Sequence, residues 1–127
     1  MHYPTDEPLA FHGPFPSGAP VIFASAAARL GAHVELAAGV GDDMFGTQFR
    51  DRLASHGVSS SSLVVDAGHP TATVFVSYET DGSRSFLFYL DGTAALSVDS
   101  DALDRAGIAD WLHVSGATLW FGGRTAS

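Results

Sequence analysis

Two short stretches of this sequence invite interpretation as ligand-binding loops, although by themselves both are better explained as ordinary turns before helices. Residues 39–46 read Gly-Val-Gly-Asp-Asp-Met-Phe-Gly, a glycine-rich turn that carries two carboxylates. Residues 17–20 read Ser-Gly-Ala-Pro before a helical pattern, so the backbone N–H groups around Gly18 and Ala19 can donate to ligand oxygens. The first stretch is not a dinucleotide-binding loop, because Met44 occupies the third glycine position. Both stretches are also compatible with ordinary turns that precede helices.

Other reactive side chains are present without the spacing that catalysis or metal binding needs. The six histidines never recur at two, three or four residues, so the sequence predicts no metal site. Ser115 lies in His-Val-Ser-Gly-Ala, which lacks both glycines of a hydrolase nucleophile turn. The aspartate pairs at 42–43 and 99–101 are placed to cap helices. We therefore assign no catalytic residue and no metal ligand from motifs.

Composition narrows the classes of partner. The chain has 127 residues, 14 acidic against 6 basic side chains and a formal charge of −8, with no cluster of Lys and Arg. Binding to nucleic acid or to an anionic membrane surface is therefore not expected. The absence of cysteine excludes disulfides and fits a cytoplasmic protein, and neither a secretory signal nor a membrane-spanning run is evident.

The hydrophobic pattern predicts alternating helices and strands. We expect helices over 20–30, from Asp42 or Asp43 to about 57, and over 99–106, and strands over 34–38, 63–65, 72–78, 86–90 and 111–114. The first helix is expected to be buried on most of its faces. Such alternation is typical of an α/β protein with a parallel sheet and crossover helices.

The strands at 72–78 and 86–90 interrupt this alternation. Thr-Asp-Gly-Ser at 80–83 predicts a tight turn between them, so they should form a hairpin. Both faces of that hairpin carry apolar side chains, which are unsuited to an edge exposed to water. We therefore expect a ligand or a partner chain to cover it.

Four segments together resemble one family, the PfkB/ribokinase carbohydrate kinases. Residues 17–32 resemble its segment "GGAPANVA…ARLGA", and residues 38–46 are similar to its signature "GxVGDDxFG". Pro70-Thr71 followed by Asp-Gly-Ser-Arg-Ser-Phe-Leu-Phe-Tyr at 81–89 resembles the family's lid segment, and residues 112–119 resemble its "LHxSGxxL" strand. The four segments occur in the family's order across residues 17 to 119.

The resemblance implies a fold and an activity. It implies part of a Rossmann-like parallel sheet with a β-hairpin lid, an incomplete ribokinase-like fold. Residues 1–16 would be an irregular lead-in, and residues 17–127 the N-terminal part of the kinase domain, with lid strands over about 71–91. The family transfers a phosphoryl group from ATP, with Mg²⁺, to a hydroxyl of a small-molecule sugar, and its lids often pair in homodimers.

The resemblance also implies substrate-binding residues. Gly18 and Ala19 match the loop whose backbone approaches a sugar hydroxyl, and Val74 and Tyr89 fall on lid positions that can face the sugar. Ile22 stands where the family has the asparagine that hydrogen-bonds the sugar. An unpaired sugar hydroxyl there would cost about 1–3 kcal/mol.

Parts of the family pattern do not occur in these 127 residues. The opening strand with its sugar-binding aspartate is not recognisable before Ser17, and the Gly-Ala-Gly-Asp motif that supplies the general base is absent. We therefore expect the chain by itself to be inactive, with ATP and Mg²⁺ used by a longer parent enzyme. The alternatives are a non-catalytic module that binds a small ligand or dimerises, and a structural α/β domain without a ligand.

Overall fold

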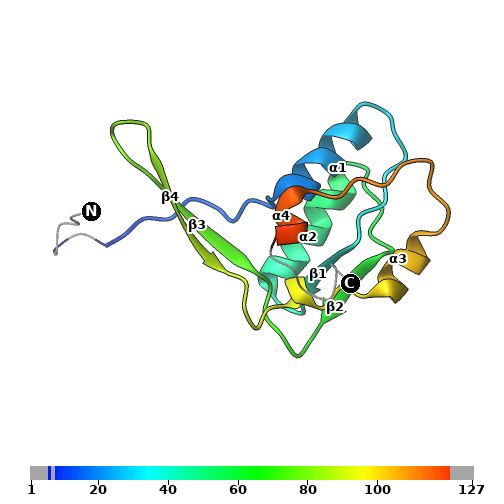
Figure 1. Ribbon diagram of the computed structural model, residues 1–127. Coiled ribbons are helices and arrows are strands. Elements are labelled where there is room, and N and C mark those ends of the chain that lie inside the picture. Colours follow the sequence, from blue (N-terminus) through cyan, green and yellow to red (C-terminus); the bar gives the residue numbers. More distant parts are fainter. Residues whose placement is uncertain (1–5, 7, 121–127) are drawn as a thin grey trace.

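The computed structural model describes residues 6 and 8–120 of the chain (Figure 1). Its elements are α1 (Ala19–Arg29), β1 (Ala38–Gly41), α2 (Met44–Ser55), β2 (Leu63–Asp66), β3 (Thr73–Tyr78), β4 (Arg84–Tyr89), the 3₁₀ turn η1 (Ala94–Leu96), α3 (Ser100–Ala106) and α4 (Gly116–Trp120). The predicted α/β class is confirmed. Within the described ranges, no helix has the length and hydropathy needed to cross a membrane.

The body of the molecule is built on one parallel crossover. β1 and β2 pair in parallel, with Ala38 opposite Leu63, and α2 connects them. Leu53 of α2 is fully buried and packs with Val21 and Ala24 of α1. Leu36 and Val58 complete this cluster. The body is therefore a small core between α1, α2 and the loops that flank β1 and β2.

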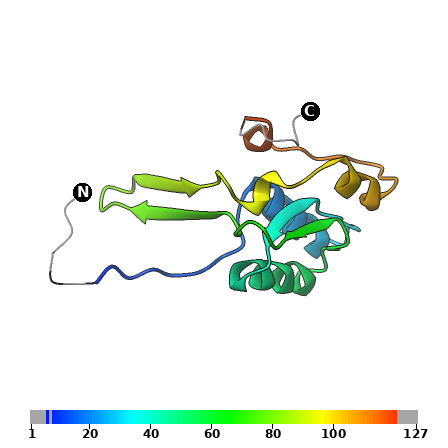
Figure 2. The ribbon, with the colours of Figure 1, turned by 90° about the horizontal axis from the view of Figure 1, so that it is seen from below.

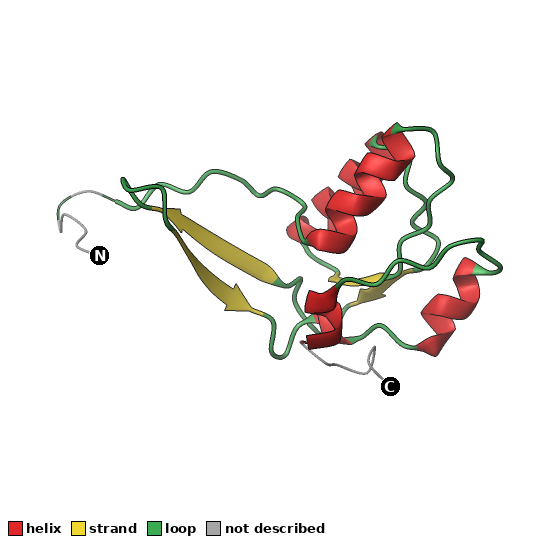
Figure 3. Cartoon of the chain, turned by 45° about the horizontal axis from the view of Figure 1, so that its top comes forward, coloured by secondary structure: helices red, strands yellow, loops and turns green. Residues whose placement is uncertain are grey.

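The hairpin projects from this body (Figure 2). β3 and β4 pair antiparallel, with Thr73 opposite Tyr89 and Tyr78 opposite Arg84. The two-stranded sheets are separate from one another (Figure 3). At the tip, the Asp81 carboxylate accepts a hydrogen bond from the N–H of Ser83 at 2.8 Å, as expected for an Asp-Gly turn. The predicted hairpin is confirmed.

The helix predicted at 20–30 forms, but its predicted burial is wrong. Only Val21 and Ala24 of α1 are buried, whereas Ile22 and Leu30 are 61% and 89% exposed. The reason is that the core cluster covers one side of α1. Elsewhere on α1, the described part of the chain adds the extended segment around His113, which contacts Phe23, and no further helix or strand packs extensively there.

Two predicted strands are also wrong. The strand expected at 34–38 begins only at Ala38, and Glu35 makes an isolated bridge with Ser59. The Glu35 carboxylate instead accepts hydrogen bonds from the backbone of Ser62 and the hydroxyl of Ser61, both at 2.7 Å. The backbone on either side of Glu35 bonds to Ser59, but the paired segment turns at Ser61 and Ser62, so this pairing is interrupted before the ladder of β1 and β2 begins.

Residues 111–114 form no strand, because no described strand lies alongside to pair with them. The segment instead crosses α1, where the His113 ring stacks on Phe23 with centroids 3.8 Å apart. Ser115 directly precedes α4, and its hydroxyl accepts a hydrogen bond from the N–H of Thr118 in the first turn, at 3.2 Å.

Candidate functional site

The loop before α1 leaves backbone donors available. Gly18 is the N-cap and has φ +100°, a conformation that side-chain-bearing residues rarely adopt. The first helical hydrogen bond runs from the N–H of Ile22 to the carbonyl of Gly18, at 3.0 Å. The N–H groups of Ala19 and Val21 precede it and so have no acceptor within the helix. The exposed Ile22 side chain adds no hydrogen-bonding group to this loop.

The hairpin separates two residues that sequence reasoning placed together. Opposed residues of an antiparallel pair share a face, and neighbours along a strand alternate. Tyr89 lies opposite Thr73, while Val74 lies opposite Phe88. Val74 and Tyr89 are therefore on opposite faces, and a sugar bound against one face contacts only one of them.

We call the two sides the Tyr89 face and the Val74 face. The Tyr89 face consists of Thr73, Phe75, Ser77, Ser85, Leu87 and Tyr89, and the Val74 face of Val74, Val76, Tyr78, Arg84, Phe86 and Phe88. Phe75 meets Tyr89 edge-on with centroids 6.0 Å apart, and Phe11 meets Phe75 in the same way at 5.3 Å. The segment that leads to Gly18 therefore contacts the Tyr89 face.

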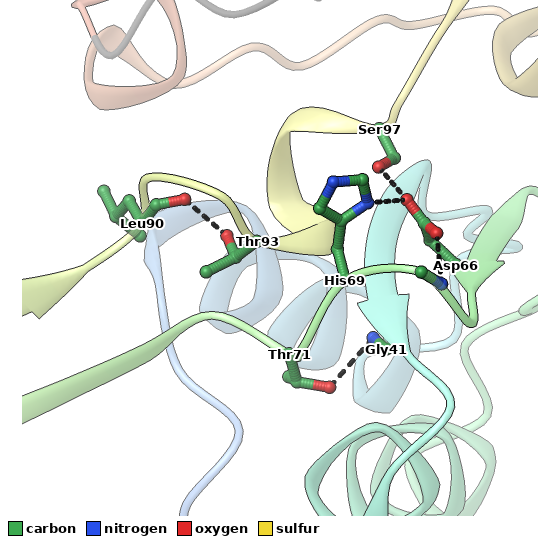
Figure 4. Close-up of polar contacts among 8 residues, drawn as sticks. Gly41, Asp66, His69, Thr71, Leu90, Thr93 and Ser97 are labelled. Carbon is green, nitrogen blue, oxygen red and sulfur yellow. Dashed lines mark hydrogen bonds and ion pairs between the residues drawn. The ribbon is translucent and has the colours of Figure 1, made fainter.

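The glycine-rich turn at 39–46 is joined to the first strand of the hairpin through Asp43. Its side chain caps α2 by accepting the N–H of Gly46 at 2.8 Å, which confirms the predicted cap. The same carboxylate accepts the hydroxyl of Thr71 at 2.7 Å and the N–H of Thr71 at 2.8 Å. The Thr71 hydroxyl in turn accepts the N–H of Gly41 at 2.9 Å (Figure 4).

The glycines of this turn allow the close approach. A Cβ on Gly41 would lie 2.6 Å from the carbonyl oxygen of His69 and 2.7 Å from the N–H nitrogen of Thr71. A Cβ on Gly46 would collide with the carbonyl oxygen of Gly41. Gly41 is therefore required by the close approach of residues 69–71, and Gly46 by the close approach of the Gly41 carbonyl.

A second group of polar side chains joins the segment after β2 to the segment after η1. The Asp66 carboxylate accepts the Ser97 hydroxyl at 2.5 Å and the N–H of Gly68 at 2.9 Å. The His69 nitrogen Nδ1 lies 2.8 Å from the same carboxylate (Figure 4). Nothing in the spacing of these residues indicates the contact, because Asp66 and Ser97 are 31 residues apart.

Hydrogen bonds lower the pKa of both carboxyl groups. The pKa of Asp43 lies below its usual value, chiefly because the backbone N–H of Thr71 donates to the ionised form. The pKa of Asp66 falls from 3.8 to about 2, with the Ser97 hydroxyl as the largest cause and His69 the next. Both groups are therefore carboxylates at neutral pH, and neither is tuned to act as a general base there.

The lowered pKa of Asp66 predicts a loss of stability in acid. Because the folded-state pKa lies below the unfolded one, its contribution is fully present above about pH 4 and disappears as the pH falls through about 2. We expect Ser97→Ala to reduce this acid sensitivity by raising the pKa toward its usual value. Melting temperatures of both proteins, recorded at several pH values between about pH 5 and about pH 2, measure the effect. The same change of melting temperature with pH in both proteins would contradict it.

The described residues do not by themselves make a site for ATP and Mg²⁺. They contain no group of three His, Cys, Asp or Glu side chains placed to hold a metal ion. The Gly-Ala-Gly-Asp motif, absent from the sequence, leaves these residues without the general base that phosphoryl transfer would need.

A parallel crossover, a glycine loop at a helix start and a projecting hairpin fastened to an acidic turn together form an α/β domain. Residues 15–121 match the model of the pfkB family of carbohydrate kinases. The chain belongs to this family. The predicted resemblance and the ribokinase-like fold are confirmed.

Relatives and a solved structure agree with this assignment. The chain is 37% identical to Fructokinase-1 of Zea mays over 70% of this chain and 28% of that protein. It is 36% identical to Fructokinase of Klebsiella pneumoniae over 82% of this chain and 34% of that protein. A candidate ribokinase II of E. coli, solved in complex with ATP and Mg²⁺, superposes with a TM-score of 0.70 at 35% identity, over 79% of this chain and 32% of that one. The chain thus spans about a third of the length of the proteins it matches.

Proposed function

We propose that this chain is the N-terminal, sugar-binding portion of a carbohydrate kinase that transfers a phosphoryl group from ATP to a sugar hydroxyl. The observation that carries the proposal is the family match over residues 15–121, which contains both the Gly18 loop and the hairpin. The hairpin is the lid of this site, and closure of a lid over the sugar excludes water from the transferred phosphoryl group. ATP and Mg²⁺ belong to the complete enzyme, in a cytoplasmic setting.

The sugar lies against the Tyr89 face of the lid. This face carries an aromatic pair, Phe75 and Tyr89, together with the hydroxyl of Thr73, and Phe11 of the segment leading to Gly18 contacts it. Aromatic rings suit the apolar C–H surface of a sugar, and the hydroxyl groups of Tyr89 and Thr73 suit its polar edge. Gly18 and Ala19 add backbone donors, while Ile22 adds only apolar contact. Val74 lies on the other face, so its side chain does not contact a sugar bound in this way.

A pair of tyrosines on opposite faces tests this assignment. Both Tyr89 and Tyr78 are exposed on the hairpin, so Tyr89→Ala and Tyr78→Ala remove the same chemistry from different faces. We expect fructose, the sugar in the names of the relatives, to raise the melting temperature of the chain. Tyr89→Ala should weaken fructose binding about tenfold or more and Tyr78→Ala should leave it unchanged. A larger loss with Tyr78→Ala would place the sugar on the Val74 face.

The isolated chain should not turn over ATP. Without a general base and a phosphate-binding motif, in-line transfer lacks its positioning and electrostatic stabilisation. ATP hydrolysis or fructose phosphorylation by the purified 127-residue protein, above that of a mock preparation, would refute this. Extending the chain by the remaining part of a related fructokinase should restore phosphorylation of the sugar.

A second candidate function is dimerisation through the hairpin. The Val74 face exposes Val76 and Phe86, at 39% and 52%, beside the stacked ring of Phe88. Apolar surface of this kind favours association with a second copy. Light scattering over a range of concentrations distinguishes a dimer from a monomer, and Phe86→Lys should shift a dimer to the monomer. A monomer at all concentrations would exclude this function.

A further inference from the structure

We propose that Asp43 is a positioning residue that fixes the start of the hairpin to the body through Thr71, so that the ladder of the hairpin depends on this attachment at its base. The proposal rests on the proposed function only where it calls the hairpin a lid over a sugar. The attachment itself is a property of the chain and is tested without any ligand. We call Gly41, Asp43 and Thr71 the anchor.

The anchor joins three elements through one carboxylate. Oxygen Oδ1 of Asp43 accepts the N–H of Gly46 and the hydroxyl of Thr71, and Oδ2 accepts the N–H of Thr71. The Thr71 hydroxyl also accepts the N–H of Gly41. The end of β1, the start of α2 and the residue two before β3 are therefore held in one hydrogen-bonded group. Hydrogen bonds to a carboxylate are stronger than those between neutral groups.

The second strand of the hairpin is also attached at its base, through the residues that follow β4. The N–H and the hydroxyl of Thr93 both donate to the carbonyl of Leu90, at 3.2 and 2.6 Å. The N–H of Ala94 donates to the carbonyl of Pro70 at 2.9 Å, which ties the outgoing chain to the incoming one. The incoming chain is therefore attached to the body as far as Thr71, and the outgoing chain from Leu90 onward.

Beyond these points the hairpin depends mainly on its own ladder. β3 contacts β4 extensively, and neither strand packs extensively on another helix or strand of the described chain. Backbone movement is easiest where a well-bonded segment meets a poorly packed one. A two-stranded hairpin is marginally stable by itself in water, so the ladder of β3 and β4 depends on how the two strands are held at Thr71 and Leu90.

Two substitutions separate this role from helix capping. Asp43→Ser keeps a hydroxyl that can cap α2 through Gly46, but it is too short to reach Thr71. Thr71→Val keeps the shape of the side chain and removes the hydroxyl, without touching the cap. Thr71→Ser restores the hydroxyl and serves as the rescue. Asp42→Asn is the matched charge control, because Asp42 is exposed and makes no side-chain hydrogen bond with the described residues.

The measurement is amide hydrogen exchange of the 127-residue chain, resolved by residue. We expect Asp43→Ser and Thr71→Val to speed exchange in β3 and β4 about tenfold while α2 stays protected. Thr71→Ser and Asp42→Asn should exchange as the unmodified chain does. Unchanged exchange in the hairpin would overturn the proposal, and so would equal acceleration throughout α2 in Thr71→Val, which would indicate general unfolding.

The same variants also test whether the anchor affects sugar binding. Where the unmodified chain binds fructose, Thr71→Val should weaken binding, and Thr71→Ser should restore it. Binding that is insensitive to Thr71→Val would overturn the part of the proposal that concerns sugar contact. If the unmodified chain binds no sugar, the proposed function fails, while the exchange measurement still decides whether the anchor holds the hairpin.

Discussion

Replacing Gly39 with alanine should prevent the chain from folding stably. A Cβ at Gly39, in the middle of β1, would collide with the backbone carbonyl of Ala94 in η1. A backbone atom cannot move away by changing rotamer, so η1 or β1 must shift as a whole. Overpacking of this kind costs typically about 1–3 kcal/mol, and here we expect about 3 kcal/mol or more. Urea unfolding monitored by circular dichroism measures the loss.

Gly116→Ala is the matched control. A Cβ at Gly116 would meet no atom within 4 Å, and the residue is exposed at the start of α4. We expect its free energy of unfolding to stay within about 0.5 kcal/mol of the unmodified value. Equal stability of the Gly39 and Gly116 variants would contradict the close packing of η1 on β1, and with it the position of the segment that follows the hairpin.

Replacing Leu53 with alanine should have the second largest effect. Leu53 is fully buried at the centre of the cluster formed by α1, α2 and their flanking loops. Truncation of a buried leucine costs about 2–5 kcal/mol, through lost burial and the cavity left behind. Domains are commonly stable by only about 5–15 kcal/mol, and this small core is the main apolar cluster of the described chain. The variant should therefore melt at a much lower temperature.

Leu30→Ala provides the comparison. The Leu30 side chain is largely exposed at the C-terminal end of α1, so its removal leaves no cavity. We expect a change of about 0.5 kcal/mol or less. If both leucine variants lost the same stability, the face of α1 around Leu30 would be packed in solution, as it would be against a second copy of the chain.

Features set by neighbouring residues were predictable. The Asp43 side chain caps the N–H of Gly46, three residues away, and the Asp81 turn closes over two residues. Helix α1 follows from its apolar spacing and the glycine at its end. Each of these depends on geometry that the backbone sets within one turn, so residue type and spacing are sufficient.

Features that need a distant partner were not predictable. The apolar run at 111–114 has the composition of a strand, yet a strand exists only where another lies alongside it. For the same reason the burial of α1 was overestimated, because an apolar residue is buried only if a second layer covers it. Ile22 and Trp111 are apolar in sequence and exposed in the structure.

The same distinction between local and distant partners applies to the candidate site. The order of the motifs was sufficient to predict the family, the hairpin and the Gly18 loop. The strand register was needed to place Val74 and Tyr89 on opposite faces, and the path of the chain was needed to bring Asp43 to Thr71, 28 residues away. Register and the path of the chain decide which distant groups meet, and neither is contained in the local pattern of residues.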